Sequence, residues 1–175
     1  MKKSLVVLLI VALVFLGCAT TGKAAQEEDG RFYEKTGGFS IMIPDAWEAY
    51  EMPGLKYKIL IGPEENDSRP NINFVDEASG DALNVYVDGI IAQLQELFNE
   101  DIEIVQRDDF VTSKKLKGEK VAVNTVQFGQ HLRQTFYCFP GKGTKIMITC
   151  TVQAEAGEAF ADMFDRTLKT FEWIK

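Results

Sequence analysis

Residues 145–152, with the sequence Lys-Ile-Met-Ile-Thr-Cys-Thr-Val, constrain the fold of this chain more than any other stretch. After the lysine, the side chains at both sets of alternating positions are apolar or small. Successive side chains of a strand point to opposite faces of a sheet. A strand of this composition suits the middle of a sheet that is covered on both sides. The sequence therefore predicts a layered domain with this strand near its centre.

Short stretches with strand-like patterns account for much of the remaining chain. Pro44 ends the first of them because proline lacks a backbone N–H to donate, and residues 62–70 form a solvated loop. The turn at residues 140–143, Pro-Gly-Lys-Gly, joins the last two strands, and short connections of this kind favour antiparallel pairing. The predicted strands are residues 39–43, 55–61, 71–75, 102–105, 120–128, 132–139 and 144–152.

Two segments have the apolar spacing of amphipathic helices. The first is defined by Leu83, Val87, Ile90, Leu94 and Leu97, which follow one another at spacings of four and three residues. Ser79 is its predicted N-cap. The second, near the C-terminus, is defined by Phe160, Met163, Phe164, Thr167, Leu168 and Phe171. Helices packed on a mostly antiparallel sheet make an α+β fold.

The N-terminus has the pattern of an export signal. Lys2 and Lys3 precede an unbroken apolar run over residues 5–16. This run is too short to span about 30 Å of hydrocarbon as a stable helix. The following residues, Phe-Leu-Gly-Cys at 15–18, resemble a bacterial lipobox. That resemblance implies a signal peptide over residues 1–17, cleavage before Cys18 and lipid attachment at its thiol. An ordinary signal peptide, with a cysteine there by chance, is the alternative.

Residues 18–30 are predicted to be the lipidated cysteine followed by a flexible tether. After the cysteine they are small, polar and charged, without apolar periodicity. A flexible chain of this length holds a domain about 20 Å from the bilayer on average. Residues 31–175 then form a single domain.

The balance of charge excludes one class of partner. The chain has 26 acidic and 19 basic residues, a net charge of −7. A protein that grips nucleic acid presents a basic face. We therefore expect no nucleic-acid partner.

Side chains in catalytic or metal-binding arrangements are scarce. His131 is the single histidine, and no serine or cysteine is spaced to use it as a base. The chain lacks the close Cys or His pairs of zinc sites. The acidic residues at 64–67 and 108–109 lack the order of a calcium loop, and residues 141–144 lack the upstream glycine of a phosphate-binding loop. The sequence predicts no catalytic, cofactor-binding or metal-binding residue, no cofactor and no enzyme activity.

Cys138 and Cys150 flank the predicted hairpin turn. If residues 140–143 form that turn, Cys138 lies opposite Lys145 and Cys150 lies opposite Arg133. A disulfide needs α-carbons within about 7 Å, so two buried free thiols are predicted. A shifted register would reopen the disulfide alternative.

Four aromatic residues are predicted to lie in the core. Trp47 follows Pro44 at the end of a strand, where its ring would be buried. Phe136, Tyr137 and Phe139 lie in the hairpin. The alternative is that some of these rings face outward and form an interaction patch.

Residues 38–47, Gly-Phe-Ser-Ile-Met-Ile-Pro-Asp-Ala-Trp, resemble the opening of the PsbP-like family, which is best known from extrinsic subunits of photosystem II. The resemblance covers residues 31–175. It includes the helix around Ile90, the glycine-led strand from Gly118 and the closing Thr-Phe-Glu-Trp at 170–173. It implies an α/β/α sandwich with a central, mostly antiparallel sheet and helices on both faces. It also implies an accessory or assembly role, in this case for a bacterial lipoprotein.

The leading functional hypothesis is a membrane-anchored extracytoplasmic lipoprotein that acts as a non-catalytic binding, assembly or accessory module. It would reach the membrane through the lipid at Cys18, on the periplasmic or cell-surface side, and bind a protein partner. A carrier or sensor of a small apolar ligand held between a helix and the sheet is the first alternative. An enzyme of uncharacterised activity is the second.

Overall fold

The computed structural model describes residues 21–24, 30–64 and 68–174. This part of the chain contains two α-helices, α2 (Leu83–Phe98) and α3 (Gly157–Lys169). Its first strands are β1 (Thr21–Ala24), β2 (Arg31–Glu34), β3 (Phe39–Met42), β4 (Glu48–Glu51), β5 (Ile59–Ile61) and β6 (Asn71–Ala78). They are followed by β7 (Ile102–Val111), β8 (Lys117–Gln127), β9 (Gln130–Pro140), β10 (Thr144–Gln153) and β11 (Glu172–Trp173).

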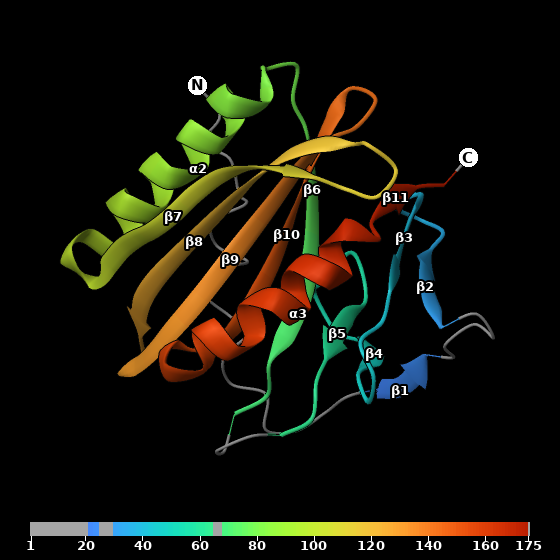
Figure 1. Ribbon diagram of the computed structural model, residues 1–175, viewed down its shortest axis with the longest axis horizontal. Helices are drawn as coiled ribbons and strands as arrows, with labels where there is room; N and C mark the ends of the chain where they lie inside the picture. The colour runs from blue at the N-terminus through green and yellow to red at the C-terminus, as the bar shows by residue number, and fades with distance from the viewer. Residues whose placement is uncertain (1–20, 25–29, 65–67, 175) are drawn as a thin grey trace.

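The strands form two sheets, and every pairing between them is antiparallel. The main sheet has eight strands in the order β1-β4-β5-β6-β10-β9-β8-β7, and a smaller sheet has the order β11-β3-β2. Figure 1 shows α3 crossing one face of the main sheet, which we call the α3 side. On the opposite face, the α2 side, α2 packs over β7, β8 and β9. The predicted α+β sandwich with helices on both faces is therefore confirmed.

Strand β10 has the central position that its composition predicts. It lies between β6 and β9, and its residues from Lys145 to Val152 are all buried. Ile146, Ile148 and Cys150 belong to the core on the α3 side, whereas Met147 belongs to the core under α2. A strand in this position must offer apolar side chains in both directions.

Aromatic rings fill the core on the α3 side. The rings of Phe139 and Phe171 stack with centroids 4.9 Å apart, and Phe110 meets Phe139 edge to face at 6.0 Å. Trp47 contacts Phe164 of α3 at 6.1 Å and is buried, as predicted. Such pairs add about 0.5–1.5 kcal/mol each beyond the area they bury. Phe136 and Tyr137 are also buried, so the core prediction for the four aromatic residues is confirmed.

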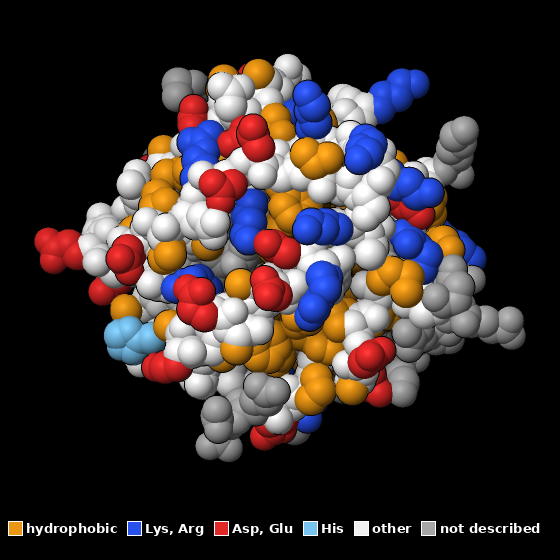
Figure 2. Space-filling view, viewed as in Figure 1, with side chains coloured by type: hydrophobic (Ala, Val, Ile, Leu, Met, Phe, Trp, Pro, Cys, Tyr) orange, Lys and Arg blue, Asp and Glu red, His pale blue; other side chains and the backbone are white. Residues whose placement is uncertain are grey.

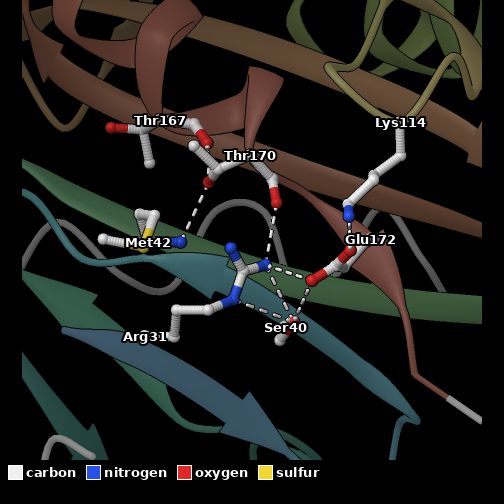
Figure 3. A network of polar contacts seen from close by, with 7 residues as sticks. All are labelled: Arg31, Ser40, Met42, Lys114, Thr167, Thr170 and Glu172. Carbon is white, nitrogen blue, oxygen red and sulfur yellow. Dashed lines mark hydrogen bonds and ion pairs between the residues drawn. The ribbon is translucent and has the colours of Figure 1, made fainter. Parts of the chain in front are cut away.

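A polar network joins the smaller sheet to the end of α3 (Figure 3). The Arg31 guanidinium donates to Ser40 Oγ and to the Thr170 carbonyl, both at 2.9 Å, and pairs with Glu172 at 3.0 Å. The backbone N–H of Met42 donates to Thr170 Oγ1 at 2.9 Å. These contacts fix β2, β3 and β11 to the C-terminal helix.

The strand predictions fail mainly in the outer strands of the main sheet. β7 extends to Val111, well beyond the predicted 102–105, and most of its residues are exposed. An edge strand buries little, so its apolar pattern is weak and its length is hard to read from sequence. β4 was not predicted, and only residues 59–61 of the predicted strand 55–61 pair. The N–H of Leu55 instead donates to the Met52 carbonyl in a turn.

The N-cap prediction for α2 is wrong. The helix begins at Leu83, and Ala82 occupies the cap position in an extended conformation without a side-chain hydrogen bond. Ser79 lies outside the helix, where its hydroxyl accepts a hydrogen bond from the N–H of Asp81 at 3.3 Å. Serine caps turns as readily as helices, and here the local turn takes its hydroxyl.

The register of the β9–β10 hairpin differs from the predicted one by two residues. Pro140 lies opposite Lys145, and the N–H of Gly141 donates to the Thr144 carbonyl at 2.8 Å, so the turn comprises 141–144. Cys138 therefore faces Met147, and Cys150 faces Thr135. Positions 147 and 150 point to opposite faces of the sheet. The two thiols are free and buried, as predicted.

The signal peptide over 1–17 and Cys18 lie outside the described residues. Of the predicted tether, Thr21–Ala24 and Gly30 are described, and Thr21–Ala24 forms β1 beside β4. This short strand differs from the expected lack of regular structure. No helix within the described ranges is long and apolar enough to cross a membrane.

Candidate functional site

Uncharged polar side chains gather at one end of the main sheet on the α2 side. Paired residues of neighbouring strands share a face, and the register aligns Thr149 with Asn73, and Thr151 with both Asn71 and Gln134. All members of the group are buried, with exposed fractions of 7% or less. We call the group the polar array: Asn71, Asn73, Thr125, Gln127, Gln134, Thr149 and Thr151.

The strands that supply the polar array change character halfway along this face. Toward the other end of the same strands, the α2 side carries Val121, Val123, Phe136, Cys138 and Met147, which pack against α2. The helix contributes Tyr86, Val87, Ile90 and Leu94 to that cluster. Among the described elements, α2 is the helix on this side of the sheet. The polar array thus begins where the apolar surface under α2 ends.

The polar array has more hydrogen-bonding capacity than its own members use. The Gln127 amide donates to Thr125 Oγ1 at 3.0 Å and to Gln134 Oε1 at 2.9 Å. Three buried oxygens have no partner: Asn71 Oδ1, Gln127 Oε1 and Thr149 Oγ1. Leaving such a group buried and unpaired costs about 1–3 kcal/mol, and more than about 90% of buried polar groups in native proteins are paired.

The Tyr86 hydroxyl is the fourth unpaired buried polar atom on this side. Tyr86 extends from α2 toward the sheet, and burial raises its pKa far above the usual value for a phenol. It is therefore a neutral donor at physiological pH. All four unpaired atoms found in the described part of the chain lie on the α2 side, which makes this face the candidate binding site.

The polar groups between α3 and the sheet are arranged differently, because each has a partner. The Asp165 carboxylate of α3 accepts from Lys120 Nζ at 2.7 Å and from the Tyr137 hydroxyl at 2.6 Å. Burial, with the neighbouring carboxylate as a smaller contribution, raises the pKa of Tyr137, so the hydroxyl keeps its proton. This cluster fastens α3 to β8 and β9 and leaves no free group for a substrate.

The residues considered as chemical groups in the sequence do not form a site together. His131 is exposed on β9, beside the β8–β9 turn. Burial raises the pKa of both the Cys138 and Cys150 thiols, which disfavours the nucleophilic thiolate.

The described members of the acidic groups singled out in the sequence are not assembled into a metal site. Glu64 pairs with Arg69 at 3.2 Å, and Asp108 accepts from Gln106 at 2.5 Å. Residues 65–67 lie outside the described residues. Within those described, no group of three or more His, Cys, Asp or Glu side chains could hold a metal ion.

Sequence reasoning missed the polar array, although a signal for it exists. Thr149 and Thr151 alternate with Cys150, and Asn71 and Asn73 alternate with Ile72. A strand that is covered on both faces predicts the two threonines to be small core residues. Polar residues at every second position of a central strand instead indicate that one face changes from apolar to polar.

Comparison with known proteins places the fold. No protein-family model matches the chain, and no curated protein sequence matches it. The solution structure of cyanobacterial PsbP (CyanoP) from Synechocystis is similar, with a TM-score of 0.61 and 10% identity over 87% of this chain and 98% of that one. The crystal structure of LpqN, involved in cell envelope biogenesis of Mycobacterium tuberculosis, has a TM-score of 0.60 and 10% identity, over 88% and 90%.

A third similar structure is the Ran-binding protein Mog1p of Saccharomyces cerevisiae. Its TM-score is 0.51 at 10% identity, and the match covers 90% of this chain and 97% of that one. The first two similarities confirm the PsbP-like fold expected for residues 31–175. At these identities they establish the fold and not a function.

Proposed function

We propose that this chain is an exported lipoprotein, anchored through Cys18, whose domain over residues 31–175 is a non-catalytic binding or assembly module. The polar array, whose members are at most 7% exposed, is its recognition site, which a partner reaches only when the array becomes uncovered. The observation that carries the proposal is the set of buried oxygens without partners on the α2 side. A fold that needed only stability would place Val or Ile at these positions, so the retained polar groups point to a partner that completes their hydrogen bonds.

The chemistry of the polar array defines the kind of partner. Its seven side chains are hydroxyls and amides without charge, so they can both donate and accept hydrogen bonds. Beyond the array on the same face, Ile61 of β5 lies directly opposite Asn71, and Ile59 packs with Tyr50. Protein interfaces combine apolar and aromatic side chains with direct hydrogen bonds. We expect a protein partner that presents uncharged hydrogen-bonding groups to this face.

The proposed location depends on the N-terminal sequence pattern described above. A basic start, a short apolar run and the lipobox-like Phe-Leu-Gly-Cys at 15–18 support export and anchoring. The similar structures agree with this setting and role, since LpqN is involved in cell envelope biogenesis and Mog1p binds Ran.

The packing under α2 bears on the carrier alternative. A small apolar ligand would lie between α2 and the sheet, where the carrier hypothesis places a crevice lined by Phe, Met and Ile. Phe136, Met147 and Ile90 instead pack in a single cluster. This favours the binding module over the carrier.

Cross-linking in intact cells, followed by affinity capture, tests the proposal. The wild-type chain is compared with Cys18→Ala, Asn71→Leu and Thr149→Val. Thr144→Val is the matched control, because it removes a hydroxyl from the opposite end of the same strand. We expect one stoichiometric partner with wild type and Thr144→Val, several-fold less with the two array variants, and none with Cys18→Ala.

Two outcomes would contradict separate parts of the proposal. Equal recovery of the partner with Asn71→Leu, Thr149→Val and wild type would remove the polar array as the recognition site. Equal labelling of Cys18→Ala and wild type by a palmitate analogue would remove the lipid anchor.

A further inference from the structure

Three segments meet at the end of the main sheet opposite the polar array. Strand β8 runs from Lys117 at this end to Gln127 in the array. The β7–β8 turn is joined to α3 by a hydrogen bond from Ser113 N–H to the Lys169 carbonyl at 2.7 Å. The β9–β10 turn is joined to β11 by the Trp173 indole, which donates to the Pro140 carbonyl at 3.0 Å.

This end concentrates positive charge on an acidic protein. Figure 2 shows Lys and Arg side chains gathered at the upper right of the view, where these segments lie. We call the group the basic end, and all its members are exposed: Lys114, Lys115, Lys117, Lys142, Arg166 and Lys169. Without these six, the chain has 13 basic against 26 acidic residues.

The basic end has few ion pairs, although Asp76 and Glu77 of β6 lie at the same end of the sheet. Among the described residues, Lys114 is its one member with an ion pair, to Glu172 at 3.7 Å. Glu172 is itself shared with Arg31 at 3.0 Å, as Figure 3 shows. The other five cations face solvent, so their field extends outward over roughly a Debye length, about 8 Å at physiological salt.

The turn that carries three of these lysines is held in one conformation. The N–H of Lys115 donates to the Thr112 carbonyl at 2.9 Å, and that of Leu116 donates to Thr112 Oγ1 at 3.2 Å. Lys115 has a φ of 66°, in the left-handed region where glycine is favoured. A lysine in this conformation is strained, so its charge comes with a conformational cost that glycine would avoid. Complementing the α3 dipole accounts for Arg166 and Lys169, but not for the turn lysines.

We propose that the basic end binds the anionic phospholipid headgroups of the membrane to which the chain is anchored. The setting rests on the anchor in the proposed function; the attraction rests on the basic end alone. Clustered lysines next to an anchored surface are attracted to anionic lipid, and a short tether keeps the local headgroup concentration high. Docking at this end would turn the polar array, at the other end of the strands, away from the bilayer.

Amine footprinting of the mature lipidated protein on vesicles tests the inference. The protein is reconstituted on phosphatidylcholine vesicles and on vesicles containing about one third phosphatidylglycerol, and lysine acylation is quantified by mass spectrometry. We expect acylation of Lys114, Lys115 and Lys117 to fall at least threefold on the anionic vesicles and to recover in high salt. Lys58, which pairs with Glu51 of β4 at 3.6 Å, serves as the internal control and should not change.

Charge reversal provides the matched variants. The triple variant Lys114→Glu, Lys115→Glu, Lys117→Glu should lose the protection of Lys142 and Lys169. A variant with the same formal net charge, Lys58→Glu, Arg69→Glu, Gln130→Glu, His131→Glu, which changes residues away from the basic end, should keep it. Equal protection in both variants, or equal acylation of the wild type on both kinds of vesicle, would overturn the inference.

Flotation of the same samples separates this inference from the anchor. Flotation with both kinds of vesicle but no protection keeps the anchor and overturns the basic end. Flotation with anionic vesicles alone supports the basic end and contradicts the anchor. Flotation with neither contradicts both.

Discussion

The two faces of the main sheet differ in how their buried polar groups are paired. On the α3 side, stacked and edge-to-face aromatic rings fill the core, and the buried Lys120 and Tyr137 groups share the half-buried Asp165 carboxylate as their acceptor. On the α2 side, apolar packing under α2 covers one end of the face. The remainder holds the polar array, with oxygens that have no partner.

The contacts on the α3 side stabilise the fold, whereas the α2 side has hydrogen-bonding groups that are not used within the domain. Unpaired buried oxygens reduce the free energy of unfolding, so a protein can keep them only if other contacts compensate. The aromatic core of the α3 side is large enough to do this. We therefore expect substitutions on the α3 side to affect folding, and substitutions in the polar array to affect binding.

The largest effect is expected for Phe139→Ala. Phe139 is fully buried on the α3 side between the rings of Phe110 and Phe171. Its truncation leaves a cavity and should lower the free energy of unfolding by about 3–5 kcal/mol, measured by urea denaturation. Phe128→Ala is the control, because that ring is 66% exposed and its loss should cost under about 1 kcal/mol. Similar losses for both variants would contradict the assignment of the core.

Asp165→Ala should have the next largest effect. The substitution leaves the Lys120 ammonium, 8% exposed, and the Tyr137 hydroxyl without their acceptor. We expect a loss of about 2–4 kcal/mol in the free energy of unfolding. Asp162→Ala, at an exposed position of the same helix, should change it by less than about 0.5 kcal/mol. A loss as small as that of Asp162→Ala would show that the cluster does not fasten α3.

Gly118→Ala and Gly89→Ala compare a crowded position on the α3 side with an open position in α2. A β-carbon at Gly118 would lie 2.5 Å from the Phe139 ring and 2.6 Å from the Cys138 carbonyl, whereas nothing lies within 4 Å at Gly89. We expect Gly118→Ala to lower the melting temperature through a loss of about 1–3 kcal/mol. Gly89→Ala, inside α2, should raise it through a gain of about 0.5–1 kcal/mol. A shift in the same direction for both would contradict this contrast.

The smallest stability effect, with the opposite sign, is expected for Thr149→Val. The buried Thr149 hydroxyl has no partner, so replacing it with a methyl group should raise the free energy of unfolding by up to about 1 kcal/mol. Ser40→Ala is the comparison, because the Ser40 hydroxyl accepts from Arg31 at 2.9 Å and its loss should destabilise by about 1 kcal/mol. Destabilisation by Thr149→Val in chemical denaturation would mean that this hydroxyl is structurally satisfied.

The central strands and helices could be read from the sequence, since their patterns reflect what each face contacts. Residues 145–152 are buried on both faces, and the spacing of Leu83 to Leu97 marks α2. The outer strands of the main sheet were harder to predict. β7 exposes most of its side chains, and β4 is four residues long, so neither carries a clear apolar pattern.

The alternation of strands and helices, the antiparallel hairpins and the central place of β10 follow from the sequence, because periodicity and turn residues act between neighbours along the chain. Which distant residues meet depends on the folded structure. A two-residue shift at the β9–β10 turn changed the partners of Cys138 and Cys150. Register and turn geometry also brought Asn71 beside Thr151, and Ser113 beside Lys169. Such contacts depend on cross-strand pairing and packing, which no single stretch of the sequence encodes.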